Sequence, residues 1–333
     1  MKRIFSVAAL LLVSAGIAAY AQDWHKVEVS SLNLVGKAFE TANPYHRIDT
    51  SDYKGFDKSE NGMCREPAGL AVLFRTDATT IGVSAEFQTT NFNRSAYCSY
   101  RGFDLYIKNE KGGWTWAGCT TFDRNEPGNV RSIVKDMAPG QKECIMYLPL
   151  RSELVNCQVC VPQGSTLETL ESPFRHKIVF HGSSFTHGVS CTRAGMSYPM
   201  QFMRRTGMQV IPLGFSGHCR MQPYFAKVIE DIEADAYVFD PFSNLPASTI
   251  IERFMPFFER VVKAHPDKPI IIPRTIWWER SNFNTSERKV NTDRWAASDS
   301  LCRVLCNMYP NVYYIKPDAA MHDGECSSAD GIH

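Results

Sequence analysis

The stretch KIVFHGSSFTHG, residues 177–188, decides the fold. Its apolar start, Lys177 to Phe180, leads directly into two adjacent serines, Ser183 and Ser184, which stand between glycines. A buried strand that turns into a short polar segment is typical of α/β domains, whose sites lie at the carboxyl ends of parallel strands. On such a turn a serine hydroxyl could act as a nucleophile. The stretch alone does not tell a nucleophile from a plain polar loop, nor which serine would attack.

Downstream of this stretch, apolar runs that read as strands alternate with amphipathic helical segments. Alternation of strand and helix predicts a parallel, doubly wound sheet. The expected strands are residues 177–181, 210–213, 236–240, 269–273 and 312–315, and the expected helices are residues 198–206, 224–232, 249–264 and 287–308.

Upstream of it, short runs alternate between apolar and polar residues and are broken by Gly, Asn, Asp and Pro, as in residues 69–74, 80–87 and 143–148. That pattern predicts an all-β sandwich. The chain has 333 residues, which is more than one ordinary core, so two domains are expected. We therefore expect a β-sandwich over residues 22–170 and an α/β domain over residues 171–333.

The first residues indicate export. Lys2 and Arg3 precede an apolar run, and Ala19-Tyr20-Ala21 provides a small-residue cleavage site. This predicts a signal peptide over residues 1–21, cleaved after Ala21, and a secreted or periplasmic protein. The alternative, an uncleaved anchor, is disfavoured because the run is short for a spanning helix. No later segment reads as a membrane span.

Charge and cysteine content exclude some classes of partner and site. The 36 basic and 35 acidic residues leave a net charge of +1 without a basic stripe, so no nucleic-acid partner is expected. Eleven cysteines in an exported chain allow disulfides, but sequence does not give their pairing. Cys157-x-x-Cys160 has no second such pair and no nearby His, so a strand-borne pair is favoured over a metal or redox site.

Each predicted strand end carries polar residues that serine acyl transfer requires. Such chemistry needs a hydroxyl, a base, a group that orients the base, and donors for the oxyanion. Four loops that one sheet edge could gather supply them, and these loops contain Ser183-Ser184, Gly214 to Gly217, Asp240 to Asn244, and Asp330 to His333.

These four blocks resemble those of the SGNH (GDSL-type) hydrolase superfamily, in the same order along the chain. Gly182, Ser184, Thr186 and Gly188 match its G-D-S-L/I-T-x-G block; Gly214, Ser216 and Gly217 match N-x-G-x-S-G; Asn244 matches the third block; and Asp330 and His333 match D-x-x-H. The resemblance implies a flavodoxin-like, three-layer α/β/α domain with a parallel sheet.

The likeness extends into the N-terminal half. Gly102-Phe103-Asp104-Leu105-Tyr106 resembles the G-x-D-L-Y motif of a β-sandwich domain that precedes a subset of these esterases. Residues 193–199 and Arg274-Thr275 also resemble that subset, which is common in carbohydrate-degrading gut bacteria. The resemblance therefore covers nearly all of the chain that would remain after cleavage.

The resemblance implies a role for each matched residue. Ser184 would be the nucleophile, His333 the general base, and Asp330 the residue that orients His333. The oxyanion donors would be the backbone N–H groups of Ser184 and Gly217 and the side chain of Asn244. No metal and no cofactor are expected, because this chemistry needs neither.

Several residues near these blocks depart from the family pattern or have a second interpretation. Ser183 replaces the family's Asp, Pro212 replaces a frequent Asn, and the chain stops at His333, where family members continue with a Pro and a helix, so we expect a shortened chain. Asp240 is expected to anchor its loop. Candidate substrate contacts are His187, His218, Trp277 and Trp278.

The sequence thus predicts an exported serine esterase that removes a short acyl group, such as acetyl, from a carbohydrate or another small ester. The carbohydrate rests only on the resemblance and the export signal. Two alternatives stay open: an acyltransferase that uses the same triad, and a glycan-binding protein whose hydrolase domain is inactive.

Overall fold

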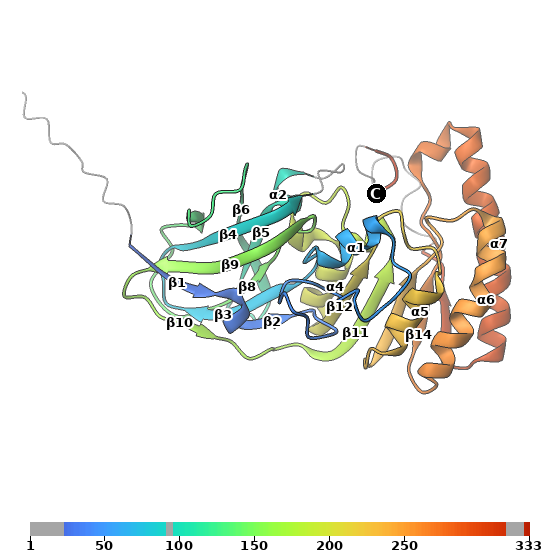
Figure 1. The fold of residues 1–333 in the computed structure, drawn as a ribbon, viewed down its shortest axis with the longest axis horizontal. Helices are drawn as coiled ribbons and strands as arrows, with labels where there is room; N and C mark the ends of the chain where they lie inside the picture. Colours follow the sequence, from blue (N-terminus) through green and yellow to red (C-terminus); the bar gives the residue numbers. More distant parts are fainter. Residues whose placement is uncertain (1–22, 91–95, 318–329) are drawn as a thin grey trace, which may run out of the picture.

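The computed structural model describes residues 23–90, 96–317 and 330–333. The predicted signal peptide, residues 1–21, lies outside the described residues. Figure 1 shows two halves side by side, with antiparallel sheets in the N-terminal half and a parallel sheet with its helices in the C-terminal half. Within the described residues, no helix combines the length and the apolar character that a membrane span needs.

The N-terminal half consists of two antiparallel sheets around an apolar core. One sheet has the order β1-β9-β4-β7, and the other has the order β10-β3-β8-β5-β6, with β2 paired to β3. The strands are β1 Trp24–Glu28, β2 Asn33–Val35, β3 Ala71–Thr76, β4 Ile81–Thr90, β5 Gly102–Lys108, β6 Trp114–Thr121, β7 Arg131–Val134, β8 Lys142–Tyr147, β9 Ser152–Pro162 and β10 Leu167–Thr169.

The cysteines of this half are consistent with strand packing. Cys157 and Cys160 lie on β9, which agrees with the predicted strand, and both are buried. Ten cysteines of the described ranges are present as free thiols.

The C-terminal half contains a five-stranded parallel sheet in the order β12-β11-β13-β14-β15. In chain order this is 2-1-3-4-5, the flavodoxin-like arrangement, and it confirms the predicted fold class. Its strands are β11 Arg175–Gly182, β12 Met208–Gly214, β13 Ala236–Asp240, β14 Ile270–Pro273 and β15 Val312–Ile315, and the α-helices of this half are α3 Ser184–His187, α4 Tyr198–Thr206, α5 Pro223–Glu230, α6 Ala247–Ala264 and α7 Thr285–Met308.

The parallel sheet is covered on both faces, which explains why its strands read as near-continuous apolar runs. Helices α5, α6 and α7 cover one face, where Val179 and Phe239 of the sheet join the same apolar cluster as Phe258 of α6. On the other face, Phe180 joins a cluster with Met203 of α4.

The second face is shared between α4 and the sandwich. Strand β3 alternates with period 2: Val72 and Phe74 belong to the sandwich core, whereas Ala71 and Leu73 belong to the cluster under the parallel sheet. Strand β8 alternates in the same way, since Tyr147 and Ile145, two positions earlier, belong to the cluster under the parallel sheet. The sheet of the sandwich that contains β3 and β8 therefore packs, together with α4, against the second face of the parallel sheet. It can do so because these strands are apolar on both sides.

A segment between β2 and β3 reaches further into the C-terminal half. It contains α1, Lys58–Arg65, which begins with a capping box between Asp57 and Glu60. Ile48 and Met63 of this segment belong to the apolar cluster of the parallel sheet and α5. Figure 1 shows α1 at the junction of the two halves.

Candidate active site

The nucleophile candidate Ser184 lies at a sharp turn between β11 and α3. A Cβ atom on Gly182 would lie 2.0 Å from Oγ1 of Thr186 and 2.9 Å from Cβ of Asp240, so only glycine fits there. Ser183 is the N-cap of α3, and its Oγ accepts a hydrogen bond from the backbone N–H of Phe185. Ser184 is therefore the first residue of the helix and lies at the carboxyl end of β11.

Ser183 and Asp240 together fix this turn. The Oγ of Ser183 donates to Oδ2 of Asp240 at 2.5 Å, and the N–H of Ser183 donates to the same oxygen at 3.2 Å. Ser243 donates to Oδ1 of Asp240 at 3.1 Å. Burial raises the pKa of Asp240 to about 6, against the effect of these hydrogen bonds. Asp240 thus anchors the loop, and Ser183 fills the place of the missing Asp by supporting the turn.

The structure brings Ser184, His333 and Asp330 into one chain of hydrogen bonds. Nδ1 of His333 lies 2.6 Å from Oδ2 of Asp330, and Nε2 of His333 lies 2.7 Å from Oγ of Ser184. Because a carboxylate only accepts, Nδ1 carries the proton and Nε2 is left to accept from the Ser184 hydroxyl. Backbone N–H groups of Ile332 and His333 donate to Oδ1 of Asp330 and fix the carboxylate.

The oxyanion candidates lie on the two loops beside the nucleophile turn. Gly182 pairs with Gly214 of β12 and with Asp240 of β13, so all three strands end at the same level. Gly217 has a φ of 75°, a conformation that favours glycine, and open space surrounds the position of its absent Cβ. Oδ1 of Asn244 accepts from the N–H of Cys219 at 3.3 Å, which leaves the Asn244 NH₂ group as a donor.

His187, a candidate substrate contact, is instead buried beneath the nucleophile turn. Its Nε2 lies 3.0 Å from Oε2 of Glu66, and its Nδ1 lies 3.0 Å from Nη1 of Arg151. Burial and then the charge of Arg151 lower the pKa of His187 to about 4, so the ring is neutral at pH 7. With an exposed fraction of 1%, His187 has no surface to offer a substrate.

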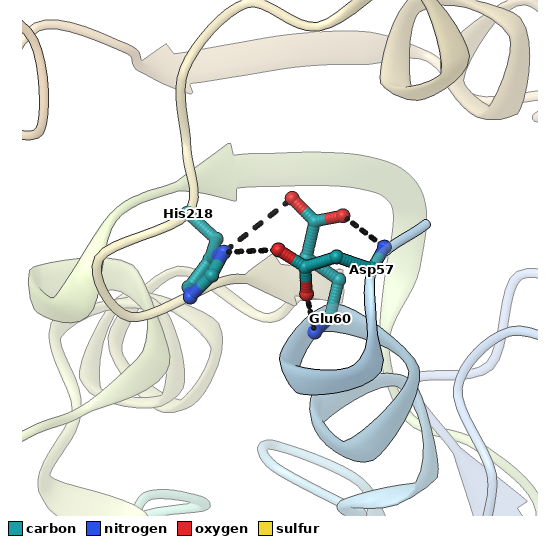
Figure 2. A group of neighbouring side chains, drawn as sticks. All are labelled: Asp57, Glu60 and His218. Atoms are coloured by element: carbon teal, nitrogen blue, oxygen red, sulfur yellow. Dashed lines mark hydrogen bonds and ion pairs between the residues drawn. The ribbon is translucent and has the colours of Figure 1, made fainter. Parts of the chain in front are cut away.

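His218, a second candidate substrate contact, lies between two carboxylates of the N-terminal half. Figure 2 shows its ring directed at Asp57 and Glu60, and Nδ1 is 3.5 Å from an oxygen of each. One ligand atom from each residue lies within 4.8 Å of the others, close enough for a metal ion. However, Glu60 already accepts from the Asp57 N–H, Gln222 and Tyr224. Donors of the protein itself therefore already occupy the Glu60 carboxylate, so the cluster is poorly suited to a metal ion.

Trp277 and Trp278, the remaining candidate contacts, have protein packing partners. The ring of Trp277 lies 5.4 Å from that of Trp295, and its Nε1 donates to Asn282 at 2.7 Å. The guanidinium of Arg294 lies 4.6 Å from the centre of the Trp278 ring. Both tryptophans thus contribute to the packing of α7 and the loop after β14, and sugar stacking on them stays an untested prediction.

Residues that the sequence did not single out also contact the site. Arg47, Glu66 and Arg151 come from the N-terminal half, are buried, and surround His187 and the end of β12. No local pattern distinguishes them, because their importance depends on contacts between the two halves. The G-x-D-L-Y motif does not by itself show the role of Asp104, which accepts a hydrogen bond from the N–H of Gly195 at 2.9 Å.

Comparisons with known proteins agree with this architecture. Residues 175–333 match the GDSL-like lipase/acylhydrolase family, and residues 22–167 match the N-terminus of SGNH-hydrolase-type esterases. A GDSL-like lipase from Bacteroides ovatus superposes with a TM-score of 0.87 at 32% identity, covering 93% of this chain and 92% of that one. No curated protein sequence gives a significant match.

Two more distant structures share the fold. A salicylyl-acyltransferase, SsfX3, from a tetracycline biosynthetic pathway has a TM-score of 0.69 at 18% identity, covering 90% of this chain and 88% of that one. A family two carbohydrate esterase from Cellvibrio japonicus has a TM-score of 0.55 at 12% identity, covering 89% of each chain. With the lipase relative and both family matches, these findings show that the chain belongs to the GDSL-like, or SGNH, acylhydrolase family and is an ester hydrolase.

Proposed function

We propose that the chain hydrolyses short acyl esters, such as acetyl esters, on carbohydrates outside the cytoplasm, with Ser184, His333 and Asp330 as its triad. The observation that carries the proposal is the hydrogen bond of 2.7 Å between Nε2 of His333 and Oγ of Ser184. It places a base within reach of the proton that must leave the nucleophile. The side chain of His333 is 10% exposed and that of Asp330 is 15% exposed, so both are largely shielded from solvent.

The mechanism follows from this geometry. His333 takes the proton of Ser184 as Oγ attacks the ester carbonyl, and the oxyanion forms near the N–H groups of Ser184 and Gly217 and the side chain of Asn244. The bond between the acyl carbon and the sugar oxygen then breaks, His333 gives its proton to that oxygen so that the sugar leaves as an alcohol, and an acyl-enzyme remains. Water repeats the sequence and releases the acid. Asp330 keeps the proton of His333 on Nδ1 and stabilises the charged ring between these steps.

Two observations support a carbohydrate substrate outside the cytoplasm. The predicted signal peptide would export the chain, and a family two carbohydrate esterase uses the same fold. The likeness to a salicylyl-acyltransferase keeps transfer to another alcohol as the second candidate, because an acyl-enzyme reacts with whichever acceptor reaches it. The close contact between Ser184 and His333 favours either reaction over a purely glycan-binding role.

The test is an ester panel with the wild-type protein and a Ser184→Ala variant. Substrates are p-nitrophenyl acetate and longer acyl homologues, acetylated xylan and acetylated pectin, and the released acid is identified. We expect acetate release that depends on Ser184. Turnover by folded Ser184→Ala would overturn the triad assignment, and acyl transfer that exceeds hydrolysis at high acceptor concentration would indicate a transferase. Retention of glycans without hydrolysis would support the binding alternative.

A further inference from the structure

The loop that carries Gly217 is held by side chains from the other half of the molecule. It leaves β12 at Gly214 and reaches α5 at Pro223. The segment from Arg47 to Glu66 belongs to the N-terminal half of the molecule. Three of its charged side chains contact this loop directly, or contact a residue that is itself hydrogen-bonded to the loop. The contacts fall on both sides of Gly217.

Arg47 holds the start of the loop. Its guanidinium is buried, and Nη1 donates to the carbonyl oxygens of Pro212 and Gly214 at 3.1 Å each. Its other nitrogens donate to the carbonyls of Met63 at 2.7 Å and Glu66 at 2.9 Å. One planar group therefore joins the end of β12 to the C-terminal end of α1, a geometry that lysine does not reproduce.

Glu66 acts on the loop through His187. Oε2 of Glu66 lies 3.0 Å from Nε2 of His187, and Nδ1 of His187 lies 3.3 Å from the N–H of Ser216. Arg151 also donates toward Nδ1, so Nδ1 is the acceptor and Nε2 carries the proton. His187 ends the short helix that Ser184 begins. One imidazole thus connects the nucleophile helix to the residue before Gly217, and its Nε2 lies between the Glu66 carboxylate and the carbonyl oxygen of Leu150, which is 3.1 Å away.

Glu60 holds the far side of the loop. Its carboxylate faces His218, the residue after Gly217, together with Asp57 (Figure 2). The same carboxylate accepts from Nε2 of Gln222 at 2.8 Å. Burial opposes ionisation of Glu60, but hydrogen bonds from His218 and the Asp57 N–H outweigh it and keep the pKa of Glu60 below its usual value. A charged Glu60 thus ties the end of the loop to the start of α1.

We infer that Arg47, Glu60 and Glu66 are positioning residues for the reaction, which hold the loop so that the Gly217 N–H faces the oxyanion. This inference rests on the proposed function. An oxyanion donor is effective only when it is oriented before the charge develops, and neighbouring groups must lock that orientation. The N-terminal half is then part of the catalytic machinery rather than a separate carbohydrate-binding module.

The test compares Glu66→Ala, Glu66→Gln and Arg47→Lys in the full chain. For each we would measure kcat and KM for p-nitrophenyl acetate and the inhibition constant of a small alkylboronic acid, whose adduct with Ser184 resembles the tetrahedral intermediate. We expect Glu66→Ala and Arg47→Lys to lower kcat by about tenfold or more, because small misplacements are costly in an oriented site. KM should stay within about twofold, and boronate affinity should fall in step with kcat. Glu66→Gln keeps an acceptor and should retain most activity.

His265→Ala is the matched control. His265 is likewise buried between two partners, Tyr237 and the carbonyl of Ile229, but it lies near the amino end of β13, away from the loop. Its kcat should equal that of the wild type even if its stability falls. Wild-type kcat in folded Arg47→Lys and Glu66→Ala, or an equal loss in His265→Ala, would overturn the inference. If Glu66→Ala does not fold, Arg47→Lys decides alone. Absence of Ser184-dependent hydrolysis in the wild type would instead refute the proposed function.

Discussion

At the scale of single residues, Ser183 and Ser184 are neighbours with different partners. The hydroxyl of Ser184 meets the free lone pair of His333, whereas that of Ser183 is committed to the buried carboxylate of Asp240. Resemblance to a family motif identified Ser184 as the nucleophile candidate from sequence. The partner of Ser183 was not predictable, because Asp240 lies 57 residues away and meets it only when β11 and β13 pair.

Asn244 is the side-chain donor of the proposed oxyanion hole. Asn244→Ala should lower kcat by about 10²–10³ with little change in KM, because the hydrogen bond forms fully only in the transition state. Steady-state kinetics with p-nitrophenyl acetate measure this. Asn311→Ala is the control, since the side chain of Asn311 donates to the carbonyls of His265 and Lys268, away from the nucleophile turn. Equal kcat values for Asn244→Ala and the wild type would remove Asn244 from the mechanism.

Asp240 should give stability a pH dependence of its own. Its pKa is about 6 in the folded chain and 3.8 when unperturbed, so the folded state binds the proton more tightly. The contribution of this group to the free energy of unfolding is complete below about pH 4 and is lost as the pH rises through about 6. The loss is up to about 3 kcal/mol.

Asp240→Asn removes this titration. We would measure the free energy of unfolding of the wild type and of Asp240→Asn in urea at several pH values. Between pH 4 and pH 7 the wild type should lose stability relative to the variant. A difference that does not change with pH would show that Asp240 ionises normally in the folded state.

At the scale of elements, the helices and strands of the C-terminal half could be predicted well. Helix α4 was expected at residues 198–206 and has those bounds, and β13 and β15 likewise agree. Their patterns are strong because each strand is buried on both faces and each helix on one. Helix α1 was not predicted, because it is a short helix with few apolar residues and its stability depends on Asp57, Glu60 and contacts with the other half.

Asp104 links the strand β5 to the segment after α3. It is fully buried; Oδ2 accepts from Gly195 and Tyr106, and Oδ1 accepts from Trp116 at 2.8 Å and lies 3.2 Å from Nε of Arg193. The G-x-D-L-Y motif and residues 193–199, which are far apart in the sequence, are therefore two sides of one contact.

Asp104→Asn should lower the free energy of unfolding by about 2–3 kcal/mol, because hydrogen bonds to a charged acceptor are lost and an NH₂ group faces donors. Urea denaturation monitored by fluorescence measures it. Asp77→Asn is the control: Asp77 accepts from one backbone N–H, that of Thr166, near the surface, and its loss should have less than half the effect. Equal effects of the two substitutions would contradict this role for Asp104.

At the scale of the whole molecule, the two halves share one apolar cluster. Leu73 and Ile145 of the sandwich pack with Phe180 and Met200 of the other half, and all four are buried. Sequence periodicity predicted both sheets but not this contact, because a strand that is apolar on both sides does not reveal what its second face covers.

Residues 171–333 expressed alone should therefore fail to fold into an active domain. Their separation exposes the apolar face under the parallel sheet and removes the segment from Arg47 to Glu66 that holds the loop of Gly217. Circular dichroism, thermal unfolding and esterase activity of the fragment test this. A cooperative, active fragment would show that the sandwich is dispensable.

The central claim is that Ser184 is the activated nucleophile of an esterase. The direct measurement is covalent labelling of the folded protein with a fluorophosphonate, followed by mass spectrometry of the peptide that contains residues 183–184. We predict a single adduct on Ser184 that disappears in Ser184→Ala and forms far more slowly in His333→Ala. An adduct on Ser183, or labelling that persists in folded Ser184→Ala, would contradict the account.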